Sequence, residues 1–301
     1  MLLPISRRRW LAGVAGAAAG LGAAVGSSRF ANEAFLVEPD QLTVTRHRVG
    51  PDSASAPRLR VVQLSDLHLA EIGSHEERIA GAVAALRPDL LVLTGDSIDQ
   101  AGRVGLLGEF LELLDPGTRK LAILGNREHS GGVDIRELER AYARRNCRLL
   151  VNDVANLRVE GRNVLVTGLD ALVGGTPDPA RALVGSEPTP NHLLLAHCPA
   201  QRDRLRWERV RPVSTARVAD GPEVDLAPYR PQWMLAGHTH GGQIAPFGLA
   251  VIRPRGSGRY VSGWYRDAVP ALYVSRGLGT SFIRARYRAT PEIAYFEWSL
   301  V

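Results

Sequence analysis

The segment Leu235–Gln243, with the sequence LAGHTHGGQ, decides how this chain is interpreted. A short apolar run ends at Gly237, and two imidazoles follow at His238 and His240. If the run is a buried strand, the chain turns as it leaves the sheet, and both rings can reach a common point above the strand end. Such a pair is typical of a metal site, whereas an isolated H-x-H can also be a loop pair bonded to water and backbone. Carboxylates and further imidazoles at other strand ends would favour the metal site.

Four other apolar runs also end in polar residues that can bind metal. In open α/β sheets, functional groups gather at the carboxyl ends of the strands. The groups that follow the four runs are Asp66 and His68; Asp96 and Asp99; Asn126, Arg127, Glu128 and His129; and His197. Five such sets, each in a loop after an apolar strand, indicate one shared site.

The chain between these sets alternates strands with helices and then becomes richer in strands. Strands are expected at Gln41–Val49, Leu59–Leu64, Leu90–Thr94, Leu121–Leu124, His192–Ala196, Trp233–Ala236, Ala271–Val274 and Ile293–Trp298. Helices are expected at Ser74–Leu86, 104–114 and 134–145, and a hairpin at 154–168 turning at Gly161-Arg162. Alternation of buried strands with helices predicts a mainly parallel sheet with helices on its faces. The segment Arg206–Pro231, rich in arginine and proline, is expected to be a surface insertion that borders the site.

Composition argues against nucleic acid as a specific partner. The net charge is +6, but Arg7, Arg8 and Arg9 alone supply half of it. The remainder is a weak field for attracting a polyanion. The two cysteines, Cys147 and Cys198, could form one disulfide in an oxidising compartment. They are expected far apart, on a helix and beside a ligand, which favours two buried free thiols.

The N-terminus reads as a targeting segment. The sequence S-R-R-R-W-L at Ser6–Leu11, followed by an Ala/Gly run to Val25, resembles a twin-arginine export signal with Trp10 where Phe is usual. Residues 1–34 are therefore expected to be an export signal or N-terminal anchor plus linker, recognised by the twin-arginine export machinery. An ordinary secretory signal or a short membrane anchor is the alternative. The protein is expected in the periplasm or on the outer face of the inner membrane, and residues 35–301 are expected to form the functional domain.

The predicted ligands suit a particular class of metal. Mixed imidazole and carboxylate ligands favour manganese, iron, zinc or cobalt, whereas calcium favours oxygen alone. A carboxylate such as Asp96 can bridge two ions. We therefore expect two divalent transition-metal ions about 3.5–4 Å apart, with a metal-bound hydroxide as nucleophile.

The motifs D-x-H, G-D-x-x-D, G-N-x-[DE], H-x-P and G-H-T-H together resemble the calcineurin-like metallophosphoesterase superfamily. The extended form GHTHGGQI, with Ser275–Thr280 and Pro291–Ile293 downstream, is similar to its exported bacterial phosphodiesterase branch. The resemblance implies a four-layer α/β/β/α sandwich, in which two mixed sheets are flanked by helices and the site lies at the carboxyl ends of the strands. It implies one ion held by Asp66, His68, Asp96 and His240, and a second held by Asp96, Asn126, His197 and His238. Asp99, three residues after Asp96, is expected instead to cap the following helix.

The chain departs from the family pattern at one position. The third motif usually reads G-N-H-[DE], and its histidine is thought to protonate the leaving group, but Arg127 stands there in this chain. An arginine stays protonated near neutral pH, although it can hold phosphate oxygens by forked hydrogen bonds. Either His129 has taken over the role of the acid, or the leaving group departs without one.

The resemblance therefore implies hydrolysis of a phosphate ester, and the departure favours a phosphodiesterase or pyrophosphatase over a monoesterase. One alternative is a lipid-linked nucleotide-sugar pyrophosphatase of the UDP-diacylglucosamine type, with the N-terminal segment and the insertion at a membrane surface. An alternative of another class is a non-catalytic metal-binding scaffold. The substrate, the metal and the oligomeric state are left open by the sequence.

Overall fold

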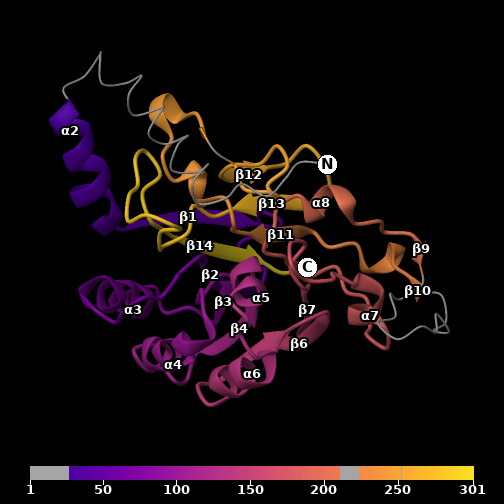
Figure 1. Ribbon diagram of the computed structural model, residues 1–301. Coiled ribbons are helices and arrows are strands. Elements are labelled where there is room, and N and C mark those ends of the chain that lie inside the picture. Colours follow the sequence, from indigo (N-terminus) through magenta and orange to yellow (C-terminus); the bar gives the residue numbers. More distant parts are fainter. Residues whose placement is uncertain (1–26, 211–223, 252) are drawn as a thin grey trace.

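The computed structural model describes residues 27–210, 224–251 and 253–301. The predicted targeting segment up to residue 26 and the middle of the predicted insertion lie outside these ranges. In the described part, two six-stranded sheets stack face to face, with helices on the outside (Figure 1). The predicted sandwich of two mixed sheets flanked by helices is confirmed.

The first sheet has the strand order β1-β14-β2-β3-β4-β5. Its strands are β1 Thr43–Val49, β14 Glu292–Ser299, β2 Arg58–Leu64, β3 Leu90–Thr94, β4 Arg119–Ile123 and β5 Cys147–Leu150. Strands β2 to β5 are parallel, while β14 runs antiparallel to β2 and parallel to β1. The parallel order brings the ends of β2, β3 and β4 to the same edge of the sheet.

The second sheet has the order β12-β13-β11-β8-β7-β6. Its strands are β12 Gly263–Tyr265, β13 Ala271–Val274, β11 Trp233–Ala236, β8 His192–Leu195, β7 Arg162–Gly168 and β6 Asp153–Val159. The four central strands are parallel, and the two edge strands are antiparallel to their neighbours. The ends of β8 and β11 therefore also share one edge.

Helices cover the first sheet and connect its strands. The α-helices are α2 Ser27–Asn32, α3 Ser74–Leu86, α4 Val104–Glu112, α5 Asn126–Ser130, α6 Ile135–Ala143, α7 Pro179–Leu183 and α8 Gln201–Arg204. Short turns of other helical types are η1 Glu33–Val37, η2 Glu38–Asp40, η3 Ala101–Arg103, η4 Ala227–Tyr229, η5 His240–Gly242 and η6 Pro246–Gly248. Buried residues of α3, α4 and α6 form one core with the outer face of the first sheet.

The alternating direction of strand side chains builds two cores from one sequence. In β3, Leu91 and Leu93 pack toward the helices, whereas Leu90 and Val92 face the second sheet. Between the sheets, the rings of Trp233 and Trp298 lie 5.2 Å apart. Strands buried on both faces explain the continuous apolar runs in the sequence.

Several strands differ in detail from the sequence-based prediction, and the short helices α5, α7 and α8 were not expected. Cys147 begins strand β5 and does not lie on a helix. Neither β5 nor β12 was expected as a strand. The hairpin of β6 and β7 turns at Glu160-Gly161, one residue earlier than predicted, and both residues have positive φ. The two cysteines are nonetheless free and buried, as predicted.

The described flanks of the predicted insertion lie away from the strand ends that carry the site. Leu226 packs in the core on the outer face of the second sheet, and β9 Arg209–Val210 pairs with β10 Val224–Asp225. The carbonyl oxygen of Tyr229 lies 2.5 Å from Nδ1 of His192, the first residue of β8. In this part of the chain, the insertion therefore contacts the beginning of β8 and not its carboxyl end. No helix among the described residues is long and apolar enough to cross a membrane.

Candidate metal centre

Six of the seven predicted ligands form two buried groups. Asp66, His68 and His240 make one group, and Asp96, His197 and His238 make the other. Within each group, the atoms that could bind a metal all lie within 4.8 Å of one another. Loops after β2 and β11 supply the first group, and loops after β3, β8 and β11 supply the second. Each group offers the donor atoms of one metal site.

Asp96 lies between the two groups. Its Oδ2 atom is 3.8 Å from Nε2 of His68 and 3.4 Å from Nε2 of His197. One carboxylate oxygen thus faces an imidazole nitrogen of each group, as a bridging ligand would. The seventh predicted ligand, Asn126, joins the second group, because its Oδ1 lies 3.2 Å from Nε2 of His197.

Three of the four histidines have an oxygen partner at the ring nitrogen that faces away from the groups, whereas Nδ1 of His240 lies 3.5 Å from Nη2 of Arg286. Nδ1 of His68 is 2.6 Å from Oδ1 of Asp99, and Nδ1 of His197 is 2.8 Å from the carbonyl oxygen of Thr94. Nε2 of His238 is 2.9 Å from the carbonyl oxygen of Arg255. In a neutral imidazole, an N–H that donates to such an oxygen leaves the opposite ring nitrogen free to bind a metal in the group, the arrangement found in metal-binding histidines. The residues present therefore fit a pair of divalent ions.

The backbone at the site is strained. Five predicted ligands have positive φ: Asp66 at 53°, His68 at 48°, Asp96 at 52°, His238 at 74° and His240 at 51°. Such conformations are uncommon outside glycine and cost about 1–3 kcal/mol each, so they persist where the surroundings impose them, typically at functional sites.

Glycines before two of the ligands permit close approach. A Cβ on Gly125 would lie 2.2 Å from Oδ1 of Asp96, and one on Gly237 would lie 2.2 Å from Oδ2 of Asp66. The glycines of the G-N and G-H motifs are thus required by the packing of one ligand loop against another.

Comparison with known proteins decides the family. Residues 59–242 match the family described as calcineurin-like phosphoesterase. The chain belongs to this family. It is a metal-dependent phosphoesterase. It is 30% identical to the metallophosphoesterase YkuE of Bacillus subtilis (strain 168), with 97% of each protein covered. It is 26% identical to the phosphodiesterase YaeI of Escherichia coli (strain K12), covering 97% of this chain and 99% of YaeI.

Among solved structures, the chain is similar to a 5'-nucleotidase precursor from Thermus thermophilus. The TM-score is 0.42 and the identity 14%, over 81% of this chain and 54% of the nucleotidase.

Asp99 positions a predicted ligand of this phosphoesterase, and the expectation that it caps a helix is wrong. Neither η3 nor α4 has a side-chain cap at its N-terminus. The Asp99 carboxylate instead accepts the hydrogen bond from Nδ1 of His68. Burial would raise the pKa of Asp99, but the hydrogen bond from His68 lowers it below its ordinary value. The carboxylate is therefore ionised and holds the imidazole in one orientation.

Glu128 is a structural residue of the phosphoesterase site whose role the sequence reading did not assign. Its buried carboxylate accepts the backbone N–H groups of Gly125 at 2.8 Å, Asp96 at 3.1 Å and Ser97 at 2.6 Å. These bonds tie the loop after β4 to the loop after β3. The acidic position of the G-N-x-[DE] motif was the signal that could have revealed this role.

The protonation of the two groups follows from burial and from neighbouring charge. Burial raises the pKa of Asp66. Burial would also raise the pKa of Asp96, but the positive charge of His197 lowers it well below its usual range. Burial and the charge of His197 lower the pKa of His238 to about 4, so this imidazole is neutral near pH 7. A neutral imidazole can donate its lone pair to a metal.

Arg127 lies at the edge of the second group. Its backbone N–H donates to Oδ1 of Asp96 at 2.8 Å, and its Nη2 donates to Oγ of Ser281 at 2.6 Å. The guanidinium carbon lies 4.4 Å from the centre of the Phe282 ring. These contacts fix the cation beside the candidate centre.

His129, the other predicted catalytic residue, belongs to neither metal group. Its Nε2 lies 2.6 Å from Oδ1 of Asp170, which follows β7. The hydrogen bond with Asp170 raises the pKa of His129. This imidazole is therefore committed to a carboxylate through one of its two nitrogens.

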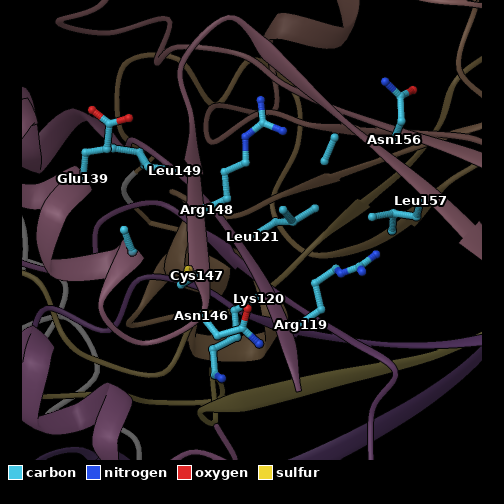
Figure 2. A pocket seen from close by; sticks show the side chains of 12 residues that line it. Arg119, Lys120, Leu121, Glu139, Asn146, Cys147, Arg148, Leu149, Asn156 and Leu157 are labelled. Carbon is cyan, nitrogen blue, oxygen red and sulfur yellow. The ribbon is translucent and has the colours of Figure 1, made fainter. Parts of the chain in front are cut away.

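One cavity of the described structure lies apart from the phosphoesterase site. A cavity of about 440 Å³ is lined by the first residues of β4 and β5 and by part of β6 (Figure 2). It contains none of the predicted ligands. Lys120, on its wall, donates from Nζ to the carbonyl oxygens of Asp115 at 2.7 Å and Thr118 at 2.9 Å. The ammonium group of Lys120 is thus bound by two backbone carbonyl oxygens of the same chain.

Proposed function

We propose that this chain is a two-metal phosphodiesterase or pyrophosphatase. The position of Asp96 Oδ2 between His68 and His197 carries the proposal, because it is the geometry of a carboxylate shared by two ions. In this proposal, one ion is held by Asp66, His68, Asp96 and His240, and the other by Asp96, Asn126, His197 and His238. The relative named phosphodiesterase YaeI supports diester chemistry.

When bound, two divalent ions generate a nucleophile from water at neutral pH and withdraw charge from the phosphoryl oxygens. Arg127 supplies the remaining positive charge, since its guanidinium is fixed by Ser281 and can donate hydrogen bonds to a phosphoryl oxygen. A guanidinium is not a general acid for a leaving group near neutral pH.

Donation of a proton to the leaving group is thus poorly supported at this site. This favours substrates whose leaving group needs no proton. His129 is bound to Asp170, and a guanidinium such as that of Arg127 is not a general acid. A leaving group that is already a weak base, such as a nucleoside phosphate or a phenolate, departs without an acid. An alkoxide from a simple monoester does not. The site therefore supports diesters and pyrophosphates with good leaving groups.

A substrate panel tests the proposal. Manganese-loaded protein should hydrolyse bis(p-nitrophenyl) phosphate faster than a simple alkyl phosphate monoester, and Asp96→Asn should abolish both reactions. His75→Gln is the matched control, because His75 lies outside the two groups. Wild-type rates in Asp96→Asn, or a preference for the monoester, would contradict the proposal.

A further inference from the structure

Large apolar side chains gather at one exposed corner of the molecule. Among the large apolar side chains of the described residues, the three most exposed are Phe247 at 80%, Leu249 at 71% and Leu36 at 67%. Phe35, Val251 and Phe282 are also exposed, at 41%, 44% and 44%. We call these six residues the apolar corner. Single exposed apolar residues are normal on a protein surface, whereas a cluster of them indicates an interaction site.

Three segments, far apart in the sequence, are bound together to form this corner. The backbone N–H of Ala245 donates to the carbonyl oxygen of Tyr287 at 2.8 Å, and that of Arg286 donates to the carbonyl oxygen of Ala34 at 2.8 Å. The rings of Phe30 and Tyr287 lie 4.8 Å apart. In Figure 1, α2, the orange turns after β11 and the yellow loop before β14 lie on the same side of the molecule. The corner is therefore a built surface.

The apolar corner lies next to the candidate metal centre. Gln243, three residues after His240, donates from Nε2 to the carbonyl oxygen of Ser281 at 3.1 Å. Phe282 of the corner stacks under the guanidinium of Arg127. A surface that binds the corner would thus lie directly beside the phosphoesterase site.

The described chain begins at the apolar corner. Ser27 opens α2, and the chain then passes through Phe30 to Phe35 and Leu36. The 26 residues before Ser27 contain the basic cluster and the Ala/Gly run described for the N-terminus. The described part of the chain therefore begins beside the exposed apolar side chains.

Charge around the corner indicates the kind of surface that it binds. Exposed arginines flank it at Arg253, Arg255, Arg284 and Arg288, of which Arg284 pairs with Asp40 at 2.6 Å. Protruding aromatic and leucine side chains ringed by arginine are the pattern of a surface that lies in a membrane interface and binds anionic headgroups. Anchors at protein–protein interfaces instead tend to fill pockets.

We propose that the apolar corner docks the protein on an anionic lipid surface, with Phe247 and Leu249 inserted among the acyl chains. The proposal goes beyond the hydrolytic function, since docking does not depend on which phosphodiester is cleaved. It places the metal centre beside the headgroups of the lipid.

A fluorescent label tests insertion directly. The native cysteines are both buried, so Leu249→Cys in the full chain offers one accessible thiol for an environment-sensitive dye. Vesicles of phosphatidylglycerol and phosphatidylcholine should shift the dye emission to the blue. The matched control is Val184→Cys, at a residue 54% exposed just after α7, which should not respond.

Three outcomes would overturn the proposal. They are no shift at position 249, an equal shift at both positions, or an emission at position 249 already shifted without vesicles. The last result would place a protein segment or a second copy of the chain on the corner.

A second variant measures the contribution of the corner to binding. Phe247→Asn combined with Leu249→Ser should lower vesicle partitioning at least about tenfold relative to Val184→Ser, because two apolar side chains no longer insert. Asparagine suits position 247, where φ is 58°. Hydrolysis of soluble bis(p-nitrophenyl) phosphate should not change, which separates failure of docking from failure of the proposed function. Unchanged partitioning would contradict the proposal.

Discussion

Asp99 determines which nitrogen of His68 faces the candidate metal. The hydrogen-bonding distance of 2.6 Å to Nδ1 leaves Nε2 for the ion. Loss of such an outer carboxylate typically weakens metal binding about 10–100-fold. We therefore expect Asp99→Asn to weaken binding by that factor while the fold is kept.

Competition with a chelator measures the effect. The control is Asp89→Asn, since Asp89 pairs with Arg60 at the surface, away from the centre. Equal metal affinity in the two variants would show that Asp99 does not orient the ligand.

The pair of His129 and Asp170 gives the fold a pH-dependent contribution. Asp170 raises the pKa of His129, so this stabilisation is complete below about pH 6.5, the ordinary value of unfolded histidine, and is lost as the pH rises through the raised value. Asp170→Asn should therefore destabilise the protein more at about pH 5.5 than at about pH 9. Urea unfolding at the two pH values checks this difference. An equal loss at both would indicate that the pair carries no charge-dependent stability.

Among the elements, β11 and β14 hold the two sheets together. Trp233 of β11 and Trp298 of β14 are both fully buried, and Phe296 lies against Trp233 with ring centres 5.1 Å apart. Truncation of a buried tryptophan typically costs about 3–5 kcal/mol, and Trp233→Ala should lower the free energy of unfolding by this amount. Leu113→Ala, at a residue 40% exposed, should lower it much less. Similar losses in the two variants would contradict this account of the interface.

The elements that the sequence predicted well are those buried on both faces. Apolar runs such as Leu90–Thr94 have no solvent-facing positions, and Ser74–Leu86 shows one apolar stripe, so length and periodicity suffice to identify them. Strand β5 has only four residues and follows a charged helix directly, so its pattern merges with that helix. Strand β12 has three residues that are all half-buried and gives no pattern. Short edge strands are recognised by the neighbour they pair with, which the sequence does not show.

In the candidate site too, local motifs predicted the ligands, whereas contacts between residues far apart in the sequence were not predicted. Ligands such as Asp96 and His238 stand next to glycines and strand ends, so motifs reveal them. The partner of Asp99 is His68, 31 residues earlier in the chain, and local rules therefore favoured the wrong role of a helix cap. The contacts of Arg127 with Ser281 and Phe282 span more than 150 residues and became visible only in the fold.

In the whole molecule, the carboxyl ends of the parallel strands of both sheets lie together at the candidate metal centre. Loops from the first sheet supply Asp66, His68, Asp96 and Asn126, and loops from the second supply His197, His238 and His240. Each ion would thus take ligands from both sheets. Bound metal should therefore stabilise the packing of one sheet on the other, in addition to its role in hydrolysis.

The number of ions bound per chain tests the central claim most directly. Purified full-length protein is loaded with Mn²⁺, freed of unbound metal and subjected to elemental analysis, beside Asp96→Asn treated in the same way. The two groups predict about two equivalents in the wild type, and the shared position of Asp96 predicts less than about one equivalent in the variant. One equivalent or none in the folded wild type, or two equivalents retained by Asp96→Asn, would contradict a two-metal centre bridged by Asp96.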